Sequence, residues 1–142
     1  TPGHHPEHLC LLSDSGLVAG DMVAGIGTIL IPPHQGDMMT YIEQLERLLG
    51  LDPHLLFPSH GPVIPLPHRT LEHYIRHRSI RHDKVLAAVE QGHSKLEEIA
   101  KVAYEDTPDA HPSLAIDQTL SHLLSHEKDG NVRSTDGGWV RA

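Results

Sequence analysis

The sequence predicts a mixed α/β chain in two parts, divided near residue 66. In the first part, short apolar runs are bounded by Gly, Pro, Ser and Asp, a pattern typical of strands. In the second part, apolar residues recur at helical spacing over three segments. The chain then closes on two short runs around Asp136-Gly137, a pair that favours a tight hairpin.

The first part is expected to hold three short strands. Residues 8–12 (HLCLL) and 17–20 (LVAG) flank a Ser-Asp-Ser-Gly turn and predict a hairpin, with Cys10 buried in its first strand. Residues 54–57 (HLLF) predict the third strand. Glycines and prolines between residues 25 and 36 predict an irregular loop after the hairpin.

One helix is expected between the second and third strands, over residues 37–49. Asp37 is suited to cap its first turn, and Gly50 to end it. Its apolar face consists of Tyr41, Ile42, Leu45, Leu48 and Leu49.

Three helices and the hairpin describe a winged helix in the second part. A long helix is expected over residues 68–91, and a second helix after Ser94, with Glu97 completing a capping box. A third helix is expected over residues 112–128, with Trp139 packing the hairpin onto this bundle. The inward positions of the third helix are Ile116, Leu120, Leu123 and Leu124.

The charge, the cysteine count and the length of the apolar runs argue against several classes of function. The formal net charge of −8 argues against tight binding of nucleic acid, which depends on Lys and Arg. Residues 83–142 carry six Lys and Arg against eleven Asp and Glu, so we expect a structural or substrate-gating role there and no DNA binding. The single cysteine cannot form an internal disulfide, which favours a cytoplasmic protein. No apolar run approaches the roughly 20 residues that span a bilayer, so no membrane contact is expected.

Histidine is unusually abundant, at 14 of 142 residues, and imidazole is the commonest metal ligand. His4 follows a Thr-Pro-Gly turn, Asp21 ends an apolar strand, and His60 lies in a Ser-His-Gly-Pro loop after another strand. Taken singly, either histidine is more often simply exposed, and Asp21 is equally suited to cap a turn. Taken together, they fall at strand ends, whose loops converge at one sheet edge. Two imidazoles and a carboxylate suit zinc, with a position left open for an activated water.

Four segments in this order resemble the second half of metallo-β-lactamase superfamily hydrolases. The resemblance is closest to a subgroup with a winged-helix appendage, which includes glyoxalase-II-like proteins and a mitochondrial β-lactamase-like endoribonuclease. It implies that residues 1–66 are the C-terminal part of an αββα sandwich, and residues 67–142 a linking helix and winged-helix domain. The four segments are TPGHxPEHL from Thr1, LVAGDMV from Leu17, GDMMTYIEQLERLLGL from Gly36 and LLFPSHGPVI from Leu55.

The resemblance also implies a role for each candidate ligand. His4 matches a ligand of a first zinc ion, Asp21 the catalytic carboxylate that bridges two ions, and His60 a ligand of the second ion. In such enzymes a metal-bound hydroxide attacks an ester, a thioester or a phosphodiester, in a small molecule or possibly in RNA. The run from Tyr74 to Arg81 resembles a stretch near the substrate side, and its Arg-rich face, with Arg78 as the candidate, could contact a phosphate or carboxylate; a solvated face paired with surface acids is the alternative. His34 could line the cleft or simply lie on the loop surface.

The sequence departs from the family pattern in two respects. The HxHxDH motif, which supplies the remaining ligands, occurs nowhere in the 142 residues. His5 stands where the family usually has Ser or Thr, and its imidazole could crowd the site or add a ligand. We therefore expect half of a two-zinc centre, with partial metal binding or none, and no activity from this chain alone.

The alternative to a hydrolase is a non-catalytic fragment that acts as a folded winged-helix and association module. Half of a sandwich leaves one sheet face uncovered, and large exposed apolar patches are unfavourable in monomers. That interpretation predicts a homodimer, or pairing with a missing N-terminal half.

Overall fold

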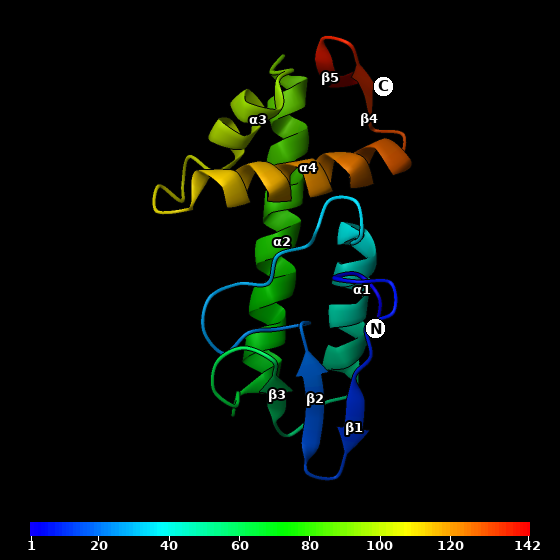
Figure 1. Ribbon diagram of the computed structural model, residues 1–142, viewed down its shortest axis with the longest axis vertical. Helices are drawn as coiled ribbons and strands as arrows, with labels where there is room; N and C mark the ends of the chain where they lie inside the picture. Colours follow the sequence, from blue (N-terminus) through cyan, green and yellow to red (C-terminus); the bar gives the residue numbers. More distant parts are fainter.

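The computed structural model describes residues 1–142 and places a small mixed sheet at one end of the molecule (Figure 1). Strand β1 (Leu11–Ser13) pairs antiparallel with β2 (Gly16–Gly20), and β2 pairs parallel with β3 (Leu56–Pro58). The predicted strands are therefore confirmed, with the first beginning three residues later than expected, at Leu11. Cys10 consequently precedes the strand, where it lies half-buried against the core.

Helix α1 (Met38–Gly50) covers one face of the sheet, as its apolar face predicts. The Asp37 side chain accepts a hydrogen bond of 2.8 Å from the backbone N–H of Thr40, which confirms the predicted cap. The core beneath the helix includes Leu17 of β2 and Leu56 of β3. The helix contributes Met38, Tyr41, Ile42, Leu45 and Leu48.

The long helix α2 (Pro67–Glu90) connects the two parts of the molecule and belongs to both (Figure 1). Its first turns pack Leu71 and Tyr74 into the sheet core, whereas Val85 and Val89 lie in a second, smaller core. The two hydrophobic cores therefore meet along α2 rather than at a linker before it. The two parts of the chain therefore share one continuous helix.

Helices α3 (Leu96–Ala103) and α4 (Pro112–Lys128) and the hairpin of β4 (Val132–Thr135) and β5 (Gly138–Arg141) complete the chain. Trp139 packs against the second core, as predicted. The predicted capping box is wrong, because α3 begins after Lys95 and no side chain caps it. The backbone carbonyl of Ser94 instead accepts a hydrogen bond of 2.8 Å from the Trp139 N–H. The order of elements is the one expected, and assignment to the winged-helix class stays a prediction.

Helix α4 differs most from expectation, because its buried surface is largely polar. Of the four residues predicted to face inward, only Leu123 is fully buried. The helix crosses α2 on one side and the loop between β2 and α1 on the other, so more of its surface is enclosed than an apolar stripe indicates (Figure 1). Its buried polar residues are Gln118, Thr119, Ser121, His122, Ser125 and His126.

No helix of the chain has both the length and the hydropathy needed to cross a bilayer.

Candidate metal centre

His4 is held in place from both sides by backbone contacts. The preceding Gly3 has a φ of +131°, and a Cβ there would lie 2.4 Å from Cα of Tyr41, so only glycine allows the turn to rest on α1. Nδ1 of His4 lies 2.7 Å from the carbonyl oxygen of Leu30. Because a carbonyl can only accept, Nδ1 carries the proton, so in the neutral ring Nε2 is the nitrogen with the free lone pair. This is the arrangement that orients metal-binding histidines.

Asp21 is positioned by a histidine that the sequence analysis missed. The backbone N–H of Asp21 donates a 3.0 Å hydrogen bond to Nε2 of His8, whose Nδ1 lies 2.9 Å from the Thr1 hydroxyl. Burial lowers the pKa of His8, which keeps its ring neutral and able to accept. Gly20 makes room for this ring, because a Cβ there would lie 2.5 Å from Nε2 of His8. The sequence signal was only a glycine directly before the candidate ligand.

His60 approaches the same carboxylate from the loop after β3. That loop is joined to its neighbours by backbone hydrogen bonds from Ser59 N–H to the Gly20 carbonyl and from Gly25 N–H to the His60 carbonyl, of 3.1 and 2.8 Å. Nε2 of His60 lies 3.2 Å from Oδ1 of Asp21. On the other side, Nε2 of His4 lies 3.8 Å from Oδ2 of Asp21. The structure thus brings together all three predicted ligands.

The two donor separations around Asp21 are close to those expected between ligands of one zinc ion. Zinc bonds of about 2.0–2.2 Å in a tetrahedron place neighbouring donor atoms about 3.4 Å apart, close to the two observed separations. Oδ1 of Asp21 is buried and has no hydrogen-bond partner, although such an acceptor is costly to leave unsatisfied. A cation would satisfy it. No group of three or more His, Cys, Asp or Glu side chains in the chain is arranged so that it could hold a metal ion, so the residues present form only two donor pairs that share Asp21.

The remaining predicted site residues lie outside this cluster. His34 and His5 are exposed, and Nδ1 of His5 accepts a hydrogen bond from the Glu7 N–H. Arg78 is only 3% exposed, and its guanidinium donates to Gln118, to Thr28 and to the Ile29 carbonyl. The alternative of a solvated Arg78 is therefore wrong. Contact of Arg78 or His34 with a substrate stays a prediction.

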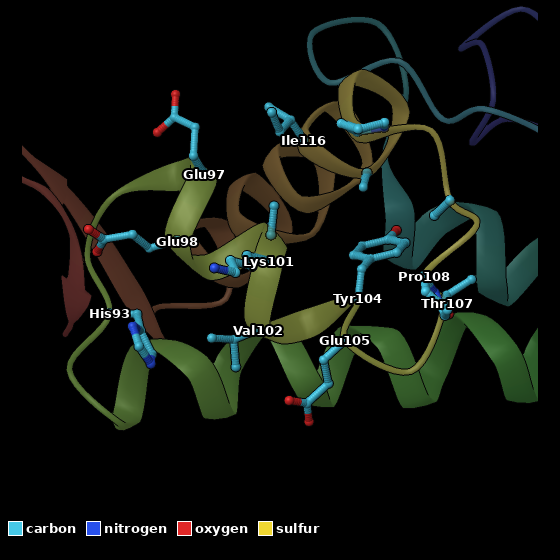
Figure 2. A pocket seen from close by; sticks show the side chains of 14 residues that line it. His93, Glu97, Glu98, Lys101, Val102, Tyr104, Glu105, Thr107, Pro108 and Ile116 are labelled. Carbon is cyan, nitrogen blue, oxygen red and sulfur yellow. The ribbon is translucent and has the colours of Figure 1, made fainter.

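A pocket of about 860 Å³ lies away from these ligands, at α3 and the start of α4 (Figure 2). Its wall is mainly apolar, with Tyr104 and Ile116 among the lining residues. Glu97, Glu98 and Glu105 also line it, and Glu97 and Glu105 point away from each other in the figure. No residue of this pocket belongs to the Asp21 cluster. Size alone does not identify the functional site, because the converging ligands and the unsatisfied carboxylate oxygen lie elsewhere.

Comparisons with known proteins show which family and which relatives the chain resembles. Residues 1–60 match the family described as the metallo-beta-lactamase superfamily. A "Beta-lactamase-like protein 2 homolog" of Drosophila melanogaster is 34% identical over 137 residues, which cover 94% of this chain and 46% of that protein. A protein of the same description in Caenorhabditis elegans is 28% identical, over 94% of this chain and 45% of that protein. The chain thus spans about half the length of the relatives it matches.

Two crystal structures show the same fold over nearly the whole chain. A metallo-beta-lactamase family protein of Thermus thermophilus superposes with a TM-score of 0.78 at 20% identity, over 100% of this chain and 48% of that one. A beta-lactamase domain protein of Burkholderia ambifaria gives a TM-score of 0.78 at 24% identity, over 99% of this chain and 45% of that one. The likeness therefore extends through α2, α3 and α4 as well as the sheet.

Proposed function

Because this chain belongs to the metallo-β-lactamase superfamily through residues 1–60, we propose that it supplies half of the metal centre of a zinc-dependent hydrolase. The observation that carries the proposal is the buried Oδ1 of Asp21, which has no hydrogen-bond partner and lies 3.2 Å from Nε2 of His60. Esters, thioesters and phosphodiesters are the proposed substrates, in small molecules or in RNA. Activity would require further ligands, because a two-zinc centre needs more donors than this chain provides.

Each of the residues present would have a separate role in such a site. Asp21 would hold the metal through its carboxylate, while His8 fixes the Asp21 backbone N–H, and His4 would bind through Nε2 because the Leu30 carbonyl holds its other nitrogen. His60 has a largely exposed side chain, so the cluster is open to solvent on its side. When bound, zinc lowers the pKa of a coordinated water, which supplies a nucleophile at neutral pH.

Zinc binding by the purified chain tests this proposal directly. We expect the chain to bind about one zinc ion, with affinity lost in His4→Ala and in His60→Ala, because each removes one of only three donors. His34→Ala is the matched control, since that histidine is exposed and makes no contact with Asp21. Zinc binding that survives both ligand substitutions would place the metal elsewhere. Turnover of a thioester or a phosphodiester by this chain alone would show that the half site is sufficient.

A second candidate function, association, is favoured by the uncovered face of the sheet. Leu11 and Val18 lie opposite each other in the β1–β2 register and are 67% and 48% exposed. Phe57 extends the row, because Val18 also pairs with it in β3. Helix α1 covers only the opposite face. We propose that this row packs against a second sheet, contributed by a polypeptide that corresponds to the other half of the relatives' length.

Light scattering and co-purification distinguish the possible occupants of this face. A Val18→Lys variant should lose association with such a partner, because the substitution buries a charge in an apolar contact. Leu114→Lys is the control, since Leu114 is equally exposed, at 47%, but lies on α4. Self-association that Val18→Lys abolishes would identify a second copy of this chain as the occupant. A monomer that binds neither copy nor partner would refute the proposal.

A further inference from the structure

The loop that orients His4 is held by helices from the second part of the chain. Ile31 is fully buried, and both of its backbone polar groups bond to the side chain of Gln118 in α4. The Ile31 N–H donates to Oε1 of Gln118 at 3.2 Å, and Nε2 of Gln118 donates to the Ile31 carbonyl at 2.9 Å. The side-chain amide thus pairs with this residue as a neighbouring strand would. The hydroxyl of Ser121 donates to the same carbonyl at 2.6 Å.

Gln118 is itself fixed from α2. Arg78 donates a 2.8 Å hydrogen bond from Nη1 to Oε1 of Gln118, and its other terminal nitrogen donates to Thr28 and to the Ile29 carbonyl. Both side chains are buried, with exposed fractions of 6% and 3%. A buried amide with all of its partners aligned has little freedom to rotate, because every alternative orientation leaves polar groups unsatisfied. The loop is therefore clamped from two helices at once.

One peptide group joins this clamp to the metal centre. The N–H that Gln118 accepts belongs to Ile31, and the carbonyl that accepts from His4 belongs to Leu30. The two lie in the same planar peptide unit, where a trans peptide directs its N–H and its C=O in opposite directions. Fixing the N–H on the side of α4 therefore aims the carbonyl at Nδ1 of His4. Donation by the N–H also polarises the peptide, which strengthens its carbonyl as an acceptor.

We propose that Gln118 is a positioning residue for the metal centre, which holds the Leu30–Ile31 peptide so that His4 presents Nε2 to the metal. The second part of the chain thereby controls a ligand located in the first. This inference rests on the proposed metal site for its functional consequence, although the orientation of His4 can be tested without any metal.

The test is the protonation pattern of the His4 ring in the metal-free chain, measured from its ¹⁵N chemical shifts at pH 7.5. The wild-type chain should show Nδ1 protonated. Gln118→Met, which matches the side chain in length but lacks its hydrogen bonds, should shift the His4 ring toward the Nε2-protonated form. Thr119→Val is the matched control, because Thr119 is equally buried in α4 but bonds only to Ala115 within the helix.

Zinc affinity supplies the second readout. Loss of a group that orients a ligand typically weakens metal binding about 10–100-fold, so Gln118→Met should fall in this range while Thr119→Val stays near wild type. If Gln118→Met does not fold, Gln118→Asn replaces it, since it keeps a buried amide but is one methylene too short to reach Ile31. A folded Gln118 variant with His4 unchanged in its ring protonation would overturn the inference. A wild-type chain without zinc affinity would instead refute the proposed function, and the ring protonation would still decide the role of Gln118.

Discussion

Acid should destabilise this chain through three histidines that pack together where α2 meets α4. Nδ1 of His82 lies 3.1 Å from Nδ1 of His122, and the ring of His82 stacks on that of His126 at 3.6 Å. His126 donates through Nε2 to the backbone carbonyl of His82. Burial, reinforced by the neighbouring His126, lowers the pKa of His82 to about 4, despite the opposing charges of Asp83 and Asp129. Burial likewise lowers the pKa of His122 and of His126.

The direction of the effect follows from the two protonation states. An unfolded histidine titrates near pH 6.5, so below that pH the unfolded chain binds protons that folded His82 does not accept. Stability from this group is therefore complete above about pH 6.5 and is lost as the pH falls toward 4. Between pH 7 and pH 5 the free energy of unfolding should fall by about 2 kcal/mol through His82 alone, or closer to 1 kcal/mol after solvent screening.

Urea denaturation at pH 7 and pH 5 measures this loss. His82→Gln removes the titrating group. Between pH 7 and pH 5, this variant should therefore lose about 1–2 kcal/mol less unfolding free energy than the wild type loses. His54→Gln serves as the control, because His54 is exposed and makes no contact with the cluster. Equal losses in both variants, or a stability that does not change between the two pH values, would refute the reasoning.

Two further substitutions test the support of the metal centre. Arg78→Met should lower the free energy of unfolding by about 3 kcal/mol, because it leaves buried acceptors on Gln118 and Ile29 without their donor. A melting temperature equal to that of the wild type within error would contradict this expectation. Gly20→Ala should cost about 2 kcal/mol, since its φ of +54° disfavours a side chain and its Cβ would displace His8 from Asp21. For Gly20→Ala, denaturation gives the stability, and an unshifted His8 imidazole resonance would show that the ring had not moved.

Local pattern predicted most of the elements, because the signals that start and end them lie within a few residues. The Asp37 cap, the apolar face of α1 and the tight turn before Gly138 all depend on neighbours in sequence. The failures came where a distant partner decides the outcome. Ser94 has the chemistry of a cap, but the helix begins after Lys95, and the Ser94 carbonyl accepts a hydrogen bond from the N–H of Trp139, which the hairpin brings near.

The sequence by itself predicted which residues could bind a metal, since Asp21 and His60 follow strand ends, His4 follows a Pro-Gly turn, and each has a suitable donor atom. Only the tertiary structure decided how these donors are aimed. The contacts that orient them join residues far apart in the chain, such as Gln118 to Ile31, and they involve backbone groups that carry no mark in the sequence. The residue type of a polar side chain on a helix does not reveal whether that side chain faces water or a buried peptide group. The partner of such a side chain is set only once the chain has folded. In a buried site an unpaired polar group costs much more free energy than it does in water, so the fold decides which hydrogen bond is made.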